Sequence, residues 1–251
     1  MKSSLPVVFC ILFLVGSRLA AFGQGAPGGP GASLSGAMLK LFGEANKFTA
    51  KADMNAVDRA TGDTTSLVME YALSGDKTRM EMDLAQMKSA LMPATMVAQM
   101  KQMGMDKNII IVRPDKKIMW AAYPGLKAYL ELPMPDDEVA AAEAEYKIEK
   151  IELGKEVVEK HPCTKNKVIL TNPRGVKYEA LCWNASDLKD FPVQLAFEDK
   201  GSTVTLRYRD IKLAPPVDKQ FEPPAGYTKF DDQQRLMQLA MQKMMGSSKK
   251  K

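Results

Sequence analysis

Apolar and polar residues alternate with a period of two over much of the chain after residue 47. The pattern runs through 48–56, returns after the turn residues 61–63, and returns again after 74–76. Successive side chains of a strand point to opposite faces, so each run predicts a strand with one apolar face. Three such runs separated by Gly and Asp turns predict an antiparallel meander with one dry face and one wet face. The dry-face residues are Phe48, Ala50, Ala52, Met54, Leu67, Met69, Tyr71, Leu73, Met80, Met82 and Leu84.

The segment 85–105 breaks this rhythm. Its apolar residues, mostly methionines, recur at helical spacing. Pro93 should divide the segment into two helical pieces, because proline cannot continue the hydrogen-bond ladder of a helix. Gly104 is the expected C-terminal stop.

The rest of the chain continues as short strands with flanking helices. A first helix is expected at 37–47, and a surface helix at 136–146 with Asp136 as its N-cap. About five strands are expected between 147 and 213. A last helix should begin after Asp231 and end at Gly246. Further strands are predicted at 108–112, 118–123 and 128–132.

The N-terminal residues 1–23 have the features of a cleaved signal peptide. Lys2 gives a positive start, an apolar run follows, and Ala21 and Gly23 supply the small residues of a cleavage site. An uncleaved signal anchor is the alternative, although the apolar run is short for a bilayer of roughly 30 Å. Residues 24–36 are rich in Gly and Pro and predict a flexible linker. We therefore expect a periplasmic or secreted protein.

The charge of the expected mature chain is nearly balanced. Of 35 basic and 30 acidic residues, Lys2 and Arg18 leave with the signal peptide, so 33 basic residues remain. Three of those form the tail at 249–251, which leaves 30 of each sign in the body. A nucleic-acid face requires clustered cations within the fold, so no nucleic-acid partner is expected. One domain at 37–246 with a basic tail at 247–251 is the simplest organisation.

No group of residues predicts catalysis or a cofactor. A multi-histidine metal site cannot be built around His161, which is the single histidine. His161 is interpreted as a structural or surface residue. Acidic pairs such as Asp136 with Asp137 lie at expected helix starts, where carboxylates stabilise the helix end. We expect a non-catalytic protein without a metal site.

Cys163 and Cys182, the two cysteines of the expected mature chain, are predicted to form a disulfide. The compartment is oxidising, and the two residues flank the turn at 172–175 almost symmetrically. One register counts against the pairing, since joining Val168 with Tyr178 places Cys163 opposite Trp183. A bulge near Pro162 would absorb that slip.

Methionines cluster at 80–82, 100–105 and 241–245, and these clusters allow two interpretations. Thioether pairs can hold Cu(I) in an oxidising compartment, which makes copper binding one alternative. Methionine is also a pliable filler of cores and a common lining of surfaces that accept varied apolar ligands. The second interpretation is favoured, because Met80 and Met82 already lie on the dry face of a strand.

Six segments together resemble an uncharacterised family of bacterial exported proteins, a domain of unknown function with a fold similar to the lipoprotein carriers LolA and LolB. They are SGDKTRMEMD at 74–83, NIIIVRPDKKIMW at 108–120, KAYLELPM at 127–134, GKEVVEKHPCTKNKV at 154–168, WNASDLKDFPVQ at 183–194 and DKQFEPPAGYTKF at 218–230. The resemblance spans most of 48–230. It implies a mainly β fold, an open antiparallel half-barrel whose concave face is covered by helices.

The resemblance also implies a hydrophobic cleft for an acyl chain, and it carries no catalytic residues. The function expected is non-catalytic binding of a lipid, a lipoprotein acyl chain or another apolar ligand. Alternatives are a structural or partner-binding envelope protein whose cleft is filled by its own helices, and copper binding. The partner would be a lipid, a lipoprotein or an envelope protein. The predicted cleft residues are Met54, Met69, Tyr71, Met80, Met82, Leu84, Met96 and Met100.

Overall fold

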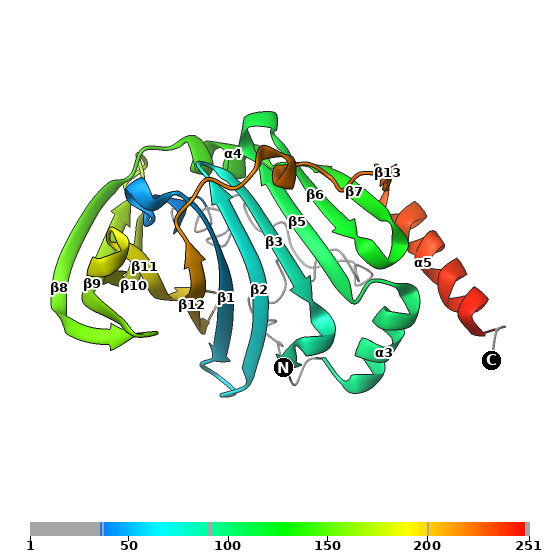
Figure 1. The fold of residues 1–251 in the computed structure, drawn as a ribbon, viewed down its shortest axis with the longest axis horizontal. Helices are drawn as coiled ribbons and strands as arrows, with labels where there is room; N and C mark the ends of the chain where they lie inside the picture. The colour runs from blue at the N-terminus through cyan, green and yellow to red at the C-terminus, as the bar shows by residue number, and fades with distance from the viewer. Residues whose placement is uncertain (1–35, 37, 90–91, 200, 249–251) are drawn as a thin grey trace. The chain divides into compact units, whose positions relative to one another are not determined.

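The computed structural model describes residues 36, 38–89, 92–199 and 201–248, and thirteen strands within them form one sheet (Figure 1). The hydrogen-bonded order is β13-β7-β6-β5-β3-β2-β1-β12-β11-β10-β9-β8, with β4 paired to β2. Since β13 and β8 end this order without pairing to each other, the sheet is open. The mainly β fold class is confirmed. The strands are β1 Lys47–Asp58, β2 Thr64–Ser74, β3 Lys77–Asp83, β4 Lys88–Ser89, β5 Lys107–Arg113, β6 Ile118–Tyr123, β7 Ala128–Pro133, β8 Lys147–Val158, β9 His161–Thr171, β10 Lys177–Ala185, β11 Phe191–Asp199, β12 Ser202–Lys212 and β13 Thr228–Phe230.

The pairs from β2 to β7 and from β8 to β12 are antiparallel, whereas β13 runs parallel to β7. Short helical turns follow many strands. The α-helices are α3 Ala94–Met103, α4 Asp136–Glu143 and α5 Gln233–Ser248, and the 3-10 turns are η1 Gly43–Ala45, η2 Leu84–Gln86, η3 Pro114–Lys116, η4 Pro124–Leu126, η5 Ser186–Leu188 and η6 Asp218–Phe221.

The chain divides into two compact units, and each is described by itself. The first comprises 1–45, 54–65 and 135–208; the second comprises 46–53, 66–134 and 209–251. In the first unit, the rings of Phe42, Phe191 and Tyr208 contact one another, with centroids 5.5–5.7 Å apart. Aromatic rings at such separations bury a large apolar area, and all three are buried.

In the second unit, one face of the sheet carries a cluster beneath the segment 213–227, which we call the strap. Phe221 of the strap is fully buried among Ala72, Ile109, Ile111, Trp120 and Ala122. The buried guanidinium of Arg113 fixes the strap beside this cluster by donating to the Phe221 carbonyl at 3.1 Å and to the Glu222 carboxylate.

Four helix predictions differ from the structure. The helix expected at 37–47 is shorter, because residues 38–40 are helical, η1 follows at Gly43–Ala45 and β1 begins at Lys47. The helical spacing before Pro93 was misleading, because 84–86 form η2 and Lys88–Ser89 form β4, which pairs with β2. Pro135 is the N-cap residue of α4 in place of Asp136. Finally, α5 continues past Gly246 to Ser248. Two helix ends agree with the sequence: α3 begins after Pro93 and ends at Gly104, whose φ of 73° is the left-handed conformation that glycine adopts easily.

The predicted disulfide is wrong. β9 and β10 pair with Cys182 opposite Asn166 and Cys163 opposite Ala185. Since side chains alternate between faces along a strand, this register places the two thiols on opposite faces of the sheet. Both cysteines are free and buried. Cys163 lies three positions along β9 from Asn166, the partner of Cys182, so a bulge of one residue would not bring the two thiols to the short Cβ separation of a disulfide.

Two glycines hold α3 against η4 at close range. A side chain on Gly125 would place its Cβ 2.4 Å from the Gly104 carbonyl oxygen. Lys243 of α5 donates to the carbonyl oxygen of Gly125 at the same point. The ends of α3, η4 and α5 therefore meet at one junction within the second unit.

Gly125→Ala is expected to lower the free energy of unfolding by about 1–2 kcal/mol, because the added methyl must push this junction apart. Urea denaturation measures the change. Gly246→Ala is the matched control, since no atom lies within 4 Å of a Cβ built there. Alanine also favours a helix over glycine, so the control should leave stability unchanged or slightly raised. Equal stability of both variants would contradict the close packing.

Candidate functional site

One face of the second unit's sheet is lined by methionine and other apolar side chains from neighbouring strands. The register places Met69 opposite Met82 and Tyr71 opposite Met80. Across the next pair, Met80 lies opposite Ile110 and Met82 opposite Asn108. Directly opposed residues share a face, so these side chains form one surface. We call it the methionine face, and its residues are Met69, Tyr71, Met80, Met82, Asn108, Ile110, Ala121 and Leu130.

Accessibility varies across the methionine face. Met69 and Met82 are buried, whereas Tyr71 and Met80, the next opposed pair along the strands, are half-buried. The ring of Tyr71 also stacks on Phe48 with centroids 5.7 Å apart. Burial raises the pKa of the Tyr71 hydroxyl above its ordinary value, as expected for a phenol in apolar surroundings. The face is therefore apolar and reachable at the Tyr71–Met80 pair.

A single amide interrupts this apolar surface. The Asn108 side chain is 3% exposed, and its Oδ1 atom has no hydrogen-bond partner among the described residues. A buried polar atom without a partner costs about 1–3 kcal/mol, so such atoms are uncommon in folded proteins. Sequence patterning does not single out this residue, which is the polar start of the apolar run at 109–112.

The remaining predicted cleft residues lie in other elements and not on the methionine face. Leu84 is buried in η2, which contacts β5, and Met100 is buried in α3, which contacts both η2 and α5. Met96 lies one helical turn before Met100 but is exposed. Met54 belongs to the first unit, where it is buried in β1. The structure thus brings Met69, Tyr71, Met80 and Met82 together, with Leu84 continuing from the end of β3.

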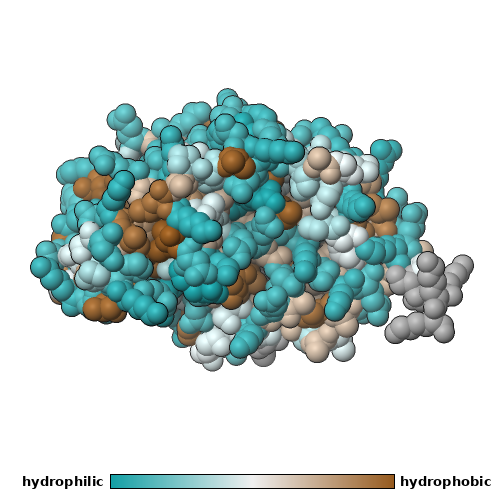
Figure 2. All heavy atoms as spheres, in the orientation of Figure 1, coloured by the Kyte–Doolittle hydropathy of each residue, from teal (hydrophilic) through white to brown (hydrophobic). Residues whose placement is uncertain are grey.

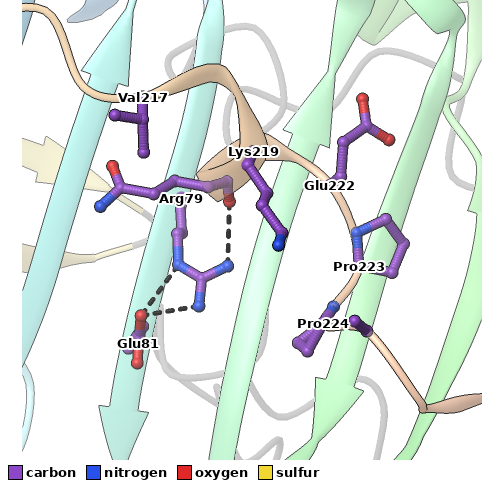
Figure 3. A pocket seen from close by; sticks show the side chains of 9 residues that line it. Arg79, Glu81, Val217, Lys219, Glu222, Pro223 and Pro224 are labelled. Carbon is purple, nitrogen blue, oxygen red and sulfur yellow. Dashed lines mark hydrogen bonds and ion pairs between the residues drawn. The ribbon is translucent and has the colours of Figure 1, made fainter.

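A pocket lies on the opposite face of the same sheet, beside the strap (Figure 3). This pocket of about 280 Å³ is lined by Arg79, Glu81, Val217, Lys219, Gln220, Glu222, Pro223, Pro224 and Ala225. Arg79 is already paired there: its Nε donates to Glu81 at 2.8 Å and its Nη1 to the Gln220 carbonyl at 2.9 Å. Because the strap has no periodic pattern, the sequence did not predict this pocket.

The residues around His161 do not form a nucleophile and base pair. His161 Nδ1 lies 2.8 Å from the Asp187 carboxylate, and the Cys163 thiol donates to the His161 carbonyl instead of its ring. Burial raises the pKa of the Cys163 thiol and raises that of Cys182 to about 12. Since the thiolate is the reactive form, both cysteines are weak nucleophiles in this fold.

No cluster of three or more His, Cys, Asp or Glu side chains that could hold a metal ion occurs within the described residues. Copper bound by methionine thioethers would need none of these side chains, so the copper alternative stays a prediction.

Several solved structures are similar to this chain at low sequence identity. A LolA superfamily protein from Nitrosomonas europaea is 12% identical; the match covers 78% of this chain and 98% of that one, with a TM-score of 0.36. A DUF1329 family protein from Desulfovibrio piger is 15% identical over 76% and 95% of the two chains, with a TM-score of 0.31. The Mycobacterium tuberculosis lipoprotein LppX is 12% identical over 74% and 98%, with a TM-score of 0.39.

The similar structures thus include a LolA superfamily protein and a DUF1329 family protein, the kinds of protein that the sequence resembles. No family model matches the chain, and no curated protein matches it. Since the identities and TM-scores are low, we take no residue role from these proteins.

Within the part of the chain that the structure describes, no helix is long and apolar enough to cross a membrane. The predicted signal peptide at 1–23 and most of the linker at 24–36 lie outside the described residues.

Proposed function

We propose that the protein is a non-catalytic envelope protein that binds a lipid or a lipoprotein acyl chain on the methionine face. The observation that carries the proposal is the combination of a reachable apolar pair, Tyr71 and Met80, with the buried amide of Asn108 on the same surface. Ligand sites are typically apolar with a small number of polar groups that fix orientation.

Methionine suits this role physically. Its side chain is unbranched and flexible, so it can repack around ligands of different shape at low cost. Met69, Met80 and Met82 occupy adjacent positions of the same sheet face. A hydrocarbon chain seated there would contact thioethers that adapt to it, which favours a range of acyl chains over one rigid molecule.

The Asn108 amide favours an amphiphile over a plain hydrocarbon. Its Oδ1 atom accepts no hydrogen bond from the described residues, and a hydroxyl or amide donor on a ligand would supply one. Lipids and acylated proteins carry such donors next to their hydrocarbon chains. A ligand of this kind would satisfy the amide while its chain covers Met80 and Tyr71.

A second candidate function is a structural or partner-binding role in which the protein's own segments fill the face. The burial of Leu84, Met87 and Met100 favours it, because these residues come from the segment that follows β3. Under this alternative the methionine face would bind no added lipid. One titration separates the two functions.

Met80→Gln is expected to weaken binding of a fluorescent long-chain fatty acid about tenfold. Glutamine keeps the length of the side chain but places a polar amide where the acyl chain would lie, which removes apolar burial on binding. The measurement is a fluorescence titration of the chain starting at residue 24. Since Met80 is only half-buried, the variant should fold normally.

Leu153→Gln is the matched control, because Leu153 is an exposed apolar residue of the first unit. It should bind the fatty acid as the unmodified chain does. Absence of saturable binding to the unmodified chain would reject the proposal and leave the self-filled alternative. Equal weakening by both variants would indicate nonspecific adsorption.

A further inference from the structure

Two segments of the second unit carry positive charge without any negative charge. No acidic residue occurs in 84–105 or in 233–251, although the rest of the expected mature body is rich in them. The basic residues in these segments are Lys88, Lys101, Arg235, Lys243, Lys249, Lys250 and Lys251. Since the body as a whole is neutral, the cations are concentrated here and the anions elsewhere.

The same two segments hold most of the methionines. Six lie in 84–105 and four in 233–251, which is ten of the 18 in the chain. The sheet's methionine face uses other residues, namely Met69, Met80 and Met82. The concentration of methionine in these two segments therefore has to be explained separately from the proposed ligand site.

The helices of these segments contact each other. α3 packs against α5 within the second unit, and α5 also contacts β7 and β13 (Figure 1). α3 exposes Lys101 and α5 exposes Arg235. The two helices together form a basic surface, which we call the helix pair.

The helix pair leaves large apolar side chains in water. Met96 of α3 is 42% exposed, and Met241 and Met245 of α5 are 50% and 58% exposed. Met241 and Met245 are four residues apart and so project from the same side of α5. Figure 2 shows pale-brown, moderately hydrophobic residues gathered over α3. Exposed apolar residues interspersed with cations are typical of helices that lie in a membrane interface.

We infer that the helix pair docks the protein on the surface of an anionic lipid bilayer. Met96, Met241 and Met245 enter the headgroup region, while Lys101 and Arg235 contact the anionic headgroups. Charge complementarity selects this occupant, because each cation near an anionic surface strengthens attachment and no carboxylate in the two helices opposes it.

Docking of this kind is independent of the proposed ligand site. It uses exposed side chains of α3 and α5, whereas the proposed function uses Tyr71, Met80 and Asn108 on the sheet. A protein that docks without binding fatty acid, or binds fatty acid without docking, would separate the two.

The test is co-sedimentation of the chain starting at residue 24 with vesicles of two compositions. One is phosphatidylcholine alone and the other an equimolar mixture of phosphatidylcholine and phosphatidylglycerol. The protein is expected to bind the anionic vesicles, to bind neutral vesicles at least about tenfold more weakly, and to be released by high salt. The double variant Met241→Gln, Met245→Gln should bind the anionic vesicles about tenfold more weakly than the unmodified chain.

The matched control is Ile151→Gln with Leu153→Gln, two exposed apolar residues of the first unit at 51% and 53% exposure. It should sediment as the unmodified chain does, and both double variants should keep fatty-acid binding and the unfolding midpoint. Failure to bind anionic vesicles, equal binding to both vesicle types, or unchanged binding of the methionine variant would each overturn the inference. Capture by a protein partner in place of vesicles would also overturn it.

Discussion

Phe221→Ala is expected to lower the free energy of unfolding by about 3–5 kcal/mol, the largest effect of any substitution proposed for this chain. Phe221 is fully buried against Ile109, Ile111 and Trp120, and it belongs to the strap, not to a strand. Truncation removes the apolar burial of the ring and leaves a cavity that the sheet cannot collapse to fill. Urea denaturation followed by tryptophan fluorescence reports the change, because Trp120 lies in the same cluster.

The control for this variant is Val217→Ala in the same strap. Val217 is 65% exposed, so its truncation should change stability by less than about 0.5 kcal/mol. An unchanged midpoint for Phe221→Ala would mean that the strap does not fold cooperatively with the sheet. Release of the strap alone would instead appear as early protease cleavage within 213–227.

The strands could be predicted because their pattern is local. The alternation in 48–56 and the short apolar run at 118–123 can be recognised without knowledge of distant residues, and β6 was predicted at both ends. The helix prediction before Pro93 failed because pairing with a neighbouring strand outweighs the helical spacing of the apolar residues. There, the Asp83 carboxylate accepts from the Ala85 N–H to stabilise η2, and Lys88–Ser89 then join β2 as β4.

The disulfide prediction failed because the side chain of one asparagine, Asn172, sets the length of the turn between β9 and β10. The side-chain oxygen of Asn172 accepts from the N–H groups of Arg174 and Val176, which widens the loop to include Val176. Thr171 consequently pairs with Lys177, and the hairpin is centred at residue 174 instead of near 173. In a sheet, an even number of positions between two residues places their side chains on the same face, and an odd number places them on opposite faces. The register in fact separates Cys163 from Cys182 by three positions.

The candidate site could be predicted only in part. The apolar alternation identified Met69, Tyr71, Met80 and Met82, since face membership follows from periodicity. It did not identify Asn108, because the absence of a hydrogen-bond partner depends on every neighbour in the fold. It also grouped Met96 with buried Met100, although residues on the same helical stripe differ in burial when only one end of the helix is covered.

Arg113→Met is expected to lower the free energy of unfolding by about 2–3 kcal/mol at neutral pH. Arg113 is buried, and it donates to Asp115 at 2.8 and 2.7 Å and to the Phe221 carbonyl at 3.1 Å. Methionine keeps most of the apolar volume but donates no hydrogen bond. The loss falls short of that for a fully buried ion pair, because the Asp115 and Glu222 side chains are partly exposed and water can solvate them.

The pH dependence of stability distinguishes the ion pairing of Arg113 from a role in packing alone. The hydrogen bond from Arg113 lowers the pKa of the Asp115 carboxyl. Burial raises the pKa of the Glu222 carboxyl, but the hydrogen bonds from Lys116 and Arg113 outweigh burial, so the pKa of Glu222 is also lowered. A carboxyl whose folded pKa is lowered stabilises the fold above the unfolded value, about 4, and loses that contribution as pH falls through the folded pKa. The unmodified chain should therefore lose stability in acid, and Arg113→Met should lose less.

Arg59→Met is the control, since Arg59 pairs with Glu198 in water and its replacement should change stability by less than about 0.5 kcal/mol. Equal acid sensitivity of Arg113→Met and the unmodified chain would show that Arg113 acts through packing alone.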